Sequence, residues 1–214
     1  GEGKYDIAYD DGEREKNVEA RLIRKLPLSP LYIACKNGHV DAARLLLENG
    51  AEVDQTRGDG ATSLYIACEK GHVEAARLLL DKGAGVDRAV EKGQWKGATP
   101  LLVACYEGHV DAARLCLDRG ADINLAADDG WTPLFSACRN GHVDAARLLL
   151  ENGAEVDRAD KLGRTPLDAA KHFHHEAVVA LLEEHYTAKF PLHAAAKTGD
   201  VDAMTRLLDG GAEV

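Results

Sequence analysis

Residues 132–156 read TPLFSACRNGHVDAARLLLENGAEV, and this stretch decides the fold. Its central string, Gly-His-Val-Asp/Glu-Ala-Ala-Arg-Leu, recurs at intervals of 33, 37 and 33 residues, beginning at Gly38, Gly71, Gly108 and Gly141. Two weaker copies follow, one with His174 in place of the glycine and one beginning at Gly199. A period of this length is typical of a solenoid, in which each unit buries its apolar face against its neighbours.

Each unit carries the signals for two helices. The first helix follows a hydroxyl residue that can cap it, at Ser29, Thr62, Thr99, Thr132 and Thr165. Proline follows four of these five caps, at a helical position where the missing N–H costs nothing. A short helix such as 31–37 then leads through a Gly-His turn to a second helix near 40–48. We expect left-handed glycines to end the second helices, at Gly50, Gly83, Gly120, Gly153 and Gly211.

The repeated unit resembles the ankyrin repeat, and six units fit this pattern to varying degrees. The resemblance implies a mainly α solenoid of helix–turn–helix units with β-hairpin fingers, and a partner bound on the concave face of fingers and inner helices. We place the units at residues 27–57, 58–90, 91–127, 128–160, 161–186 and 187–214. The fifth unit resembles a closing unit and has Tyr186 where its glycine belongs. The sixth lacks most of its finger and resembles the opening unit of another array.

Residues 1–26 follow a different pattern. Tyr5, Ile7 and Tyr9 alternate with other residues as in a half-buried strand, and Asp11-Gly12 favours a hairpin turn. This segment resembles the second half of a Tudor-like SH3-type barrel, a family in which an aromatic cage can read methylated Lys or Arg. The alternative is an N-terminal cap packed on the first unit. We expect the chain to be part of a longer protein.

Composition argues against several classes of function. The net charge is −10, with 36 acidic and 26 basic residues, which disfavours nucleic acid as a direct partner. No run of about 18 apolar residues occurs, so no membrane insertion is expected. Signatures of enzymes are missing, and we expect no enzyme activity, no cofactor and no metal. The expected state is a monomer in the cytoplasm or the nucleus.

The cysteines and histidines repeat with the frame, which favours structural roles. One slot of the first helix holds Cys35, Cys68, Cys105 and Cys138, and helices of neighbouring units pack about 10 Å apart, too far for disulfides. The residue after the turn glycine is expected to bond loop backbone of its own or an adjacent unit, at His39, His72, His109 and His142. The single local cluster should diverge rather than hold a metal: His172, His174, His175 and His185.

Positions that vary while the frame repeats are the best candidates for partner binding. The third finger has four extra residues and contains Trp95, which we expect either to project as an anchor or to fold back onto the neighbouring finger. Tyr106 interrupts a charged row on the inner helices and is the second anchor. Trp131 is interpreted as structural. The remaining candidates are charged residues of fingertips and inner helices: Arg57, Asp59, Lys70, Glu107, Asp128, Asp129, Arg139 and Arg158.

These features predict a protein–protein interaction scaffold whose partner is an unidentified protein. Two alternatives stay open. The array could be the targeting module of a larger enzyme, such as a ubiquitin ligase or a kinase. It could also belong to a chromatin methyl-lysine reader that acts through the Tudor-like segment.

Overall fold

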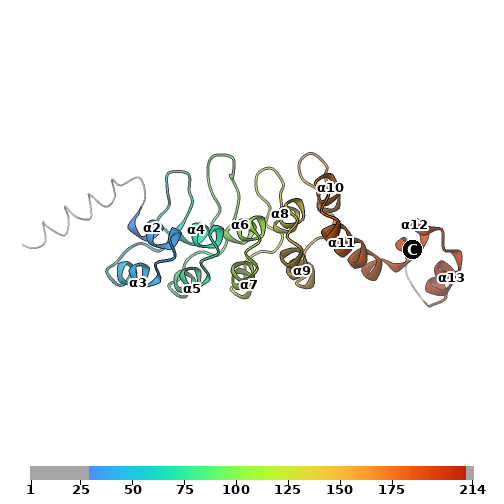
Figure 1. The fold of residues 1–214 in the computed structure, drawn as a ribbon, viewed down its shortest axis with the longest axis horizontal. Helices are drawn as coiled ribbons and strands as arrows, with labels where there is room; N and C mark the ends of the chain where they lie inside the picture. Colours follow the sequence, from blue (N-terminus) through green and yellow to red (C-terminus); the bar gives the residue numbers. More distant parts are fainter. Residues whose placement is uncertain (1–28, 211–214) are drawn as a thin grey trace, which may run out of the picture.

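The computed structural model describes residues 29–210, which form paired helices stacked side by side (Figure 1). The inner row consists of α2 (Pro30–Lys36), α4 (Ser63–Glu69), α6 (Pro100–Glu107), α8 (Pro133–Asn140) and α10 (Pro166–His172). The outer row consists of α3 (Val40–Glu48), α5 (Val73–Asp81), α7 (Val110–Asp118), α9 (Val143–Glu151) and α11 (Glu176–Lys189). Each helix packs on the next one in its own row, so the stack has two layers. Loops project beyond the inner row (Figure 1).

The predicted helix caps are confirmed. The hydroxyl of Thr132 accepts a hydrogen bond from the backbone N–H of Phe135 at 3.1 Å, and the other predicted caps accept the equivalent bond. Four of the glycines predicted to be left-handed have positive φ, namely Gly50, Gly83, Gly120 and Gly153. The fifth, Gly211, lies outside the described residues. The boundaries of these helices therefore follow from signals within a few residues of each end.

A glycine and a histidine join each unit to the next. His142 donates from Nε2 to the backbone oxygen of Tyr106 at 2.9 Å, and its ring covers Gly108, whose φ is +78°. A Cβ on Gly108 would lie 2.5 Å from Nδ1 of this ring. The same packing joins three further pairs: Gly38 with His72, Gly71 with His109, and Gly141 with His175. The predicted bond to an adjacent unit is confirmed for His72 and His142, and His175 makes it as well.

This joint ends at the fifth helix pair. His174 takes the glycine position with a φ of 59°, and Asp200 stands where the next histidine would belong. No glycine stops α11 at Tyr186, so the helix continues to Lys189, and the boundary that we drew between residues 186 and 187 falls inside it. The last pair, α12 (Pro191–Thr198) and α13 (Val201–Asp209), follows directly, and α12 packs on α11.

The cysteines lie in the core as free thiols. The four that share the inner-helix slot have no exposed surface, which confirms that they fill space: Cys35, Cys68, Cys105 and Cys138. Burial raises the pKa of Cys35 and of Cys138 to about 12 each, so these thiols stay protonated at neutral pH. One contact was not predicted. The sulfur of Cys68 lies 3.7 Å from that of Cys116, which replaces a leucine in the outer helix of the next unit.

The fingers, which are the loops before α4, α6, α8 and α10, are tight turns rather than the expected β-hairpins. In the fourth unit the N–H of Ala127 donates to the oxygen of Trp131 at 2.9 Å, and Gly130 donates back to Ala127 at 2.9 Å. One closing pair does not make a ladder, and residues 29–210 contain no strand. The expected Tudor-like segment or cap at residues 1–26 lies outside the described residues. No helix in the described part of the chain is both long and apolar enough to cross a bilayer.

Candidate partner-binding surface

Three aromatic side chains from two fingers and one inner helix form an aromatic row, defined as Trp95, Tyr106 and Trp131. Trp95 packs edge-on against Tyr106 with 4.6 Å between ring centroids. Tyr106 stacks on Trp131 at 6.5 Å. All three are half-buried. Trp95 thus folds back onto the inner helix of its own unit.

The fourth unit holds Tyr106 in place. The backbone oxygen of Tyr106 accepts hydrogen bonds from Nδ2 of Asn140 at 2.7 Å and from Nε2 of His142 at 2.9 Å. Both donors lie at the end of α8 or in the turn after it, so the joint between units also fixes the end of α6. These bonds fix the backbone of Tyr106, and the ring contacts with Trp95 and Trp131 restrict its side chain, which reduces the entropy lost on binding.

Arg139 continues the row toward the fifth unit. Its guanidinium carbon lies 4.8 Å from the centroid of Trp131 and 4.6 Å from that of Phe173, so the group sits between two rings. Its Nη1 also donates to Oδ1 of Asn140 at 3.2 Å. Contact between a guanidinium and an aromatic face is favourable, and two such faces restrict the rotamers of the long side chain.

A pocket of about 220 Å³ opens beside Arg139, between α8 and α10. We call it the arginine pocket, and its lining residues are Phe135, Arg139, Arg164, Asp168, Ala169, His172 and Phe173. The lining therefore combines two phenyl rings and one imidazole with two guanidinium groups and one carboxylate.

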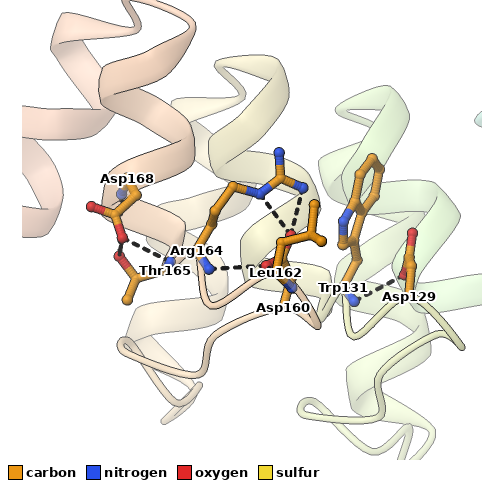
Figure 2. Close-up of polar contacts among 7 residues, drawn as sticks. All are labelled: Asp129, Trp131, Asp160, Leu162, Arg164, Thr165 and Asp168. Carbon is orange, nitrogen blue, oxygen red and sulfur yellow. Dashed lines mark hydrogen bonds and ion pairs between the residues drawn. The ribbon is translucent and has the colours of Figure 1, made fainter.

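The fifth finger fixes one wall of this pocket (Figure 2). The carboxylate of Asp160 is 1% exposed, and it accepts bonds from the backbone N–H groups of Leu162 and Arg164 at 2.9 Å each. It also accepts from Nε of Arg164 at 2.9 Å and from Nη2 at 2.5 Å. Burial alone would raise the pKa of Asp160, but the bonds from Arg164 and Leu162 outweigh it and leave the pKa lowered. The resulting anion holds the Arg164 guanidinium 5.9 Å from the ring of Phe135.

The start of α10 supplies the carboxylate of the lining. Oδ2 of Asp168 accepts from the N–H of Thr165 at 2.9 Å and from its hydroxyl at 2.7 Å (Figure 2). These two bonds lower the pKa of Asp168, so the group is ionised at neutral pH. The exchange of bonds between Thr165 and Asp168 is a capping box.

Several predicted fingertip charges bond within their own finger. Oδ1 of Asp129 accepts from the N–H of Trp131 at 3.0 Å, which sets the backbone under the aromatic row (Figure 2). Asp59 accepts from the N–H of Ala61 at 3.1 Å and forms an ion pair with Arg57. Arg57 also donates to the hydroxyl of Tyr32 at 3.1 Å. These bonds stabilise finger shape and leave less of each charge for a partner.

The other charged candidates are spread along the stack. Asp128 pairs with Lys96 of the preceding finger at 2.8 Å, and Lys70 pairs with its neighbour Glu69 at 2.7 Å. Glu107 is exposed at the end of α6. Arg158 lies in the loop between α9 and α10, donates to the backbone oxygen of Asn124 at 3.0 Å and pairs with Glu155 at 3.7 Å. Of the candidates, the structure groups Trp95, Tyr106 and Arg139 around Trp131.

Of the pocket lining only Arg139 was a candidate from the sequence, and two of the missed residues could have been found from the register. His172 and Phe173 follow Arg139 and Asn140 by 33 residues, so they occupy the same two inner-helix slots one unit later. Applying the same 33-residue spacing from the fourth unit to the fifth would have identified both residues. Trp131, interpreted as structural, also contributes exposed surface to the row. Residues 29–210 hold no group of three or more metal-binding side chains.

Comparison with family models identifies the repeats. Residues 13–90 and 85–160 match a model of three ankyrin repeats, residues 141–183 match a model of many ankyrin repeats, and residues 189–214 match the single ankyrin repeat. The search of curated proteins finds no significant match.

Proposed function

Because the chain belongs to the ankyrin repeat family, we propose that it binds a partner protein through the aromatic row and the arginine pocket beside it. Ankyrin repeats are generally protein–protein interaction modules, and this proposal assigns that role to one surface of this chain. The observation that carries it is the half-buried row Trp95, Tyr106 and Trp131, which continues into Arg139. We propose that this surface binds its partner without catalysing a reaction.

The composition of this surface supports the proposal. Tryptophan, tyrosine and arginine are the residue types most enriched among those that dominate binding energy at protein interfaces. Aromatic residues make up 5% of the chain, yet the row and the pocket bring five of them together over three consecutive units: Trp95, Tyr106, Trp131, Phe135 and Phe173. The fixed position of Tyr106 lowers the entropic cost of binding.

The test compares Tyr106→Ala with a matched control, Tyr186→Ala. Both tyrosines are half-buried, but Tyr186 lies on α11 beside Phe190 and outside the row. Wild type and both variants are used as baits for quantitative mass spectrometry, and binding of a recovered protein is then measured by calorimetry. Loss of a central aromatic residue should weaken binding by about 2 kcal/mol or more, roughly thirtyfold. The Tyr186→Ala variant should bind as wild type does.

Trp95→Ala provides an independent second variant, because Trp95 comes from a finger and Tyr106 from a helix. Thermal melts of all variants check that the stack remains folded. A partner that binds Tyr106→Ala and Trp95→Ala as tightly as it binds wild type would rule out the row as the binding surface.

The role of a targeting module in a larger enzyme uses the same surface, with a substrate as the partner. Sequence on either side of residues 1–214 would decide between that role and a free-standing scaffold. The role of a methyl-lysine reader depends on residues 1–26, and binding of a methyl-lysine peptide would be its test.

A further inference from the structure

The arginine pocket contains two guanidinium groups, and among the described residues only that of Arg164 forms an ion pair. It is balanced by Asp160 at 2.5 Å. Lys70 and Lys96 are balanced too, by ion pairs at 2.7 Å with Glu69 and 2.8 Å with Asp128. Arg139 has an amide and two rings as neighbours, and no carboxylate in residues 29–210 forms an ion pair with it. The chain has a net charge of −10, yet its described acidic residues form no ion pair with Arg139. We infer that this arginine binds an external anion.

The same arrangement disfavours a cationic ligand. Cations such as lysine or methyl-lysine bind over aromatic faces, but Arg139 already covers faces of Trp131 and Phe173. A second cation here would meet the positive charge of Arg139. The rings of this pocket therefore serve to orient the arginine rather than to receive a partner's charge.

The geometry points to a carboxylate as the ligand. The guanidinium carbon of Arg139 lies 4.8 and 4.6 Å from two ring centroids, and a guanidinium that packs on rings keeps its N–H donors in its own plane, where its edge matches the two oxygens of a carboxylate. The pocket measures about 220 Å³, below the roughly 300–1,000 Å³ of sites that enclose whole small molecules. We propose that the arginine pocket binds one acidic side chain, Asp or Glu, of the partner protein. This inference rests on the proposed function, because it defines the partner of the same surface.

A singly charged carboxylate suits the pocket better than a phosphate. The pocket lining carries two guanidinium groups and the ionised Asp168, and the charge of Arg164 is already balanced by buried Asp160. The remaining charges of Arg139 and Asp168 sum to zero, so one carboxylate that pairs with Arg139 leaves a single net negative charge in the pocket. A dianionic phosphoryl group would bring excess negative charge next to Asp168.

The test selects random linear peptides displayed on phage against the folded chain, then measures synthetic copies of the selected peptides by fluorescence anisotropy. We expect them to share an acidic residue at one fixed position. The Arg139→Gln variant should bind them about ten- to a hundredfold more weakly, the loss expected for a charge-assisted bond. The matched control is Arg147→Gln, which removes an exposed arginine from the outer helix of the same unit and should leave affinity unchanged.

Since Arg139 also packs on two rings, Arg139→Lys is the second variant, and thermal melts of both are recorded. Lysine keeps the charge but lacks the planar fork, so it should restore only part of the affinity. Peptides without an acidic residue, or peptides bound equally by wild type and Arg139→Gln, overturn the carboxylate site. Tighter binding when phosphoserine replaces the acidic residue overturns it too. If such peptides still lose affinity on Tyr106→Ala, the proposed function stands; if no selected peptide depends on Tyr106, it fails as well.

Discussion

Adding one methyl group at Gly108 should disrupt the joint between the third and fourth units. Gly108 has a φ of +78°, and a Cβ built on it lies 2.5 Å from Nδ1 of His142. Gly120 is its matched control. It has a φ of +83° in the same unit, and a Cβ built on it meets nothing within 4 Å. The two alanine variants share the cost of a left-handed backbone, but only one has a collision.

The expected losses in the free energy of unfolding differ clearly between Gly108→Ala and Gly120→Ala. A left-handed alanine costs about 1–2 kcal/mol, partly offset because alanine restricts the unfolded chain by about 0.4–1 kcal/mol relative to glycine. We therefore expect Gly120→Ala to lower the free energy of unfolding by about 1 kcal/mol. In Gly108→Ala the ring must retreat by about 1 Å to reach normal contact distance. That movement breaks the 2.9 Å bond from His142 to Tyr106 and strains the packing, which adds about 1–3 kcal/mol.

Urea unfolding followed by far-UV circular dichroism would measure both variants, with the slope of each transition checked against wild type. A double-mutant cycle with His142→Ala isolates the contact, because the excess cost of Gly108→Ala should vanish once the ring is absent. Equal losses for Gly108→Ala and Gly120→Ala would refute the reasoning, and so would an excess that persists without His142.

Three further predictions concern the fifth finger, the core and acid stability. Asp160→Asn should lower the free energy of unfolding by about 2 kcal/mol, because Arg164 and two backbone N–H groups lose a charged acceptor, whereas Asp129→Asn should cost about 1 kcal/mol or less by urea denaturation. The hydroxyl of Ser136 is fully buried with no hydrogen-bond partner, so Ser136→Ala should raise the melting temperature and stabilise the fold by up to about 1 kcal/mol; a lower melting temperature would contradict this. The pKa values of Asp59, Asp160 and Asp168 are lowered by folding, so the folded state binds fewer protons than the unfolded state. The stability that they confer should be complete above about pH 5 and should fall as the pH drops below the unfolded-state value of about 4 and through their folded-state values, which urea titrations from about pH 6 to pH 3 would show.

Helix ends and core positions could be predicted because their signals are local and repeat. Thr132 is the N-cap of α8 and its hydroxyl bonds the N–H three residues on, and the left-handed Gly153 follows the C-cap residue of α9. The core cysteines follow from the period alone. The contact between Cys68 and Cys116 did not, since it depends on how an inner helix meets the outer helix of the next unit.

The candidate site could be predicted only in part for the same reason. Trp95 and Tyr106 could be predicted as candidates because each departs from the repeated pattern. The sequence around them carries no signal that their rings are in contact. The position of Arg139 between two rings depends on the stacking distance between the fourth and fifth units. The end of α11 was not predicted. A missing glycine at Tyr186 indicates that the helix continues past this residue, but it does not indicate the residue at which the helix ends.

Insertions and deletions are among the mutations that most often ruin a fold, and the third finger shows where this chain can accept them. Its closing bond joins Val90 to Ala98 at 3.0 Å and encloses four more residues than the bond that joins Ala127 to Trp131. The end of the longer loop still meets the next finger, through the N–H of Asp128 and the oxygen of Lys96 at 2.9 Å. Length can therefore change at the fingertips while the helices keep their register. A lineage carrying this array could alter what it recognises, one loop at a time, without rebuilding the stack.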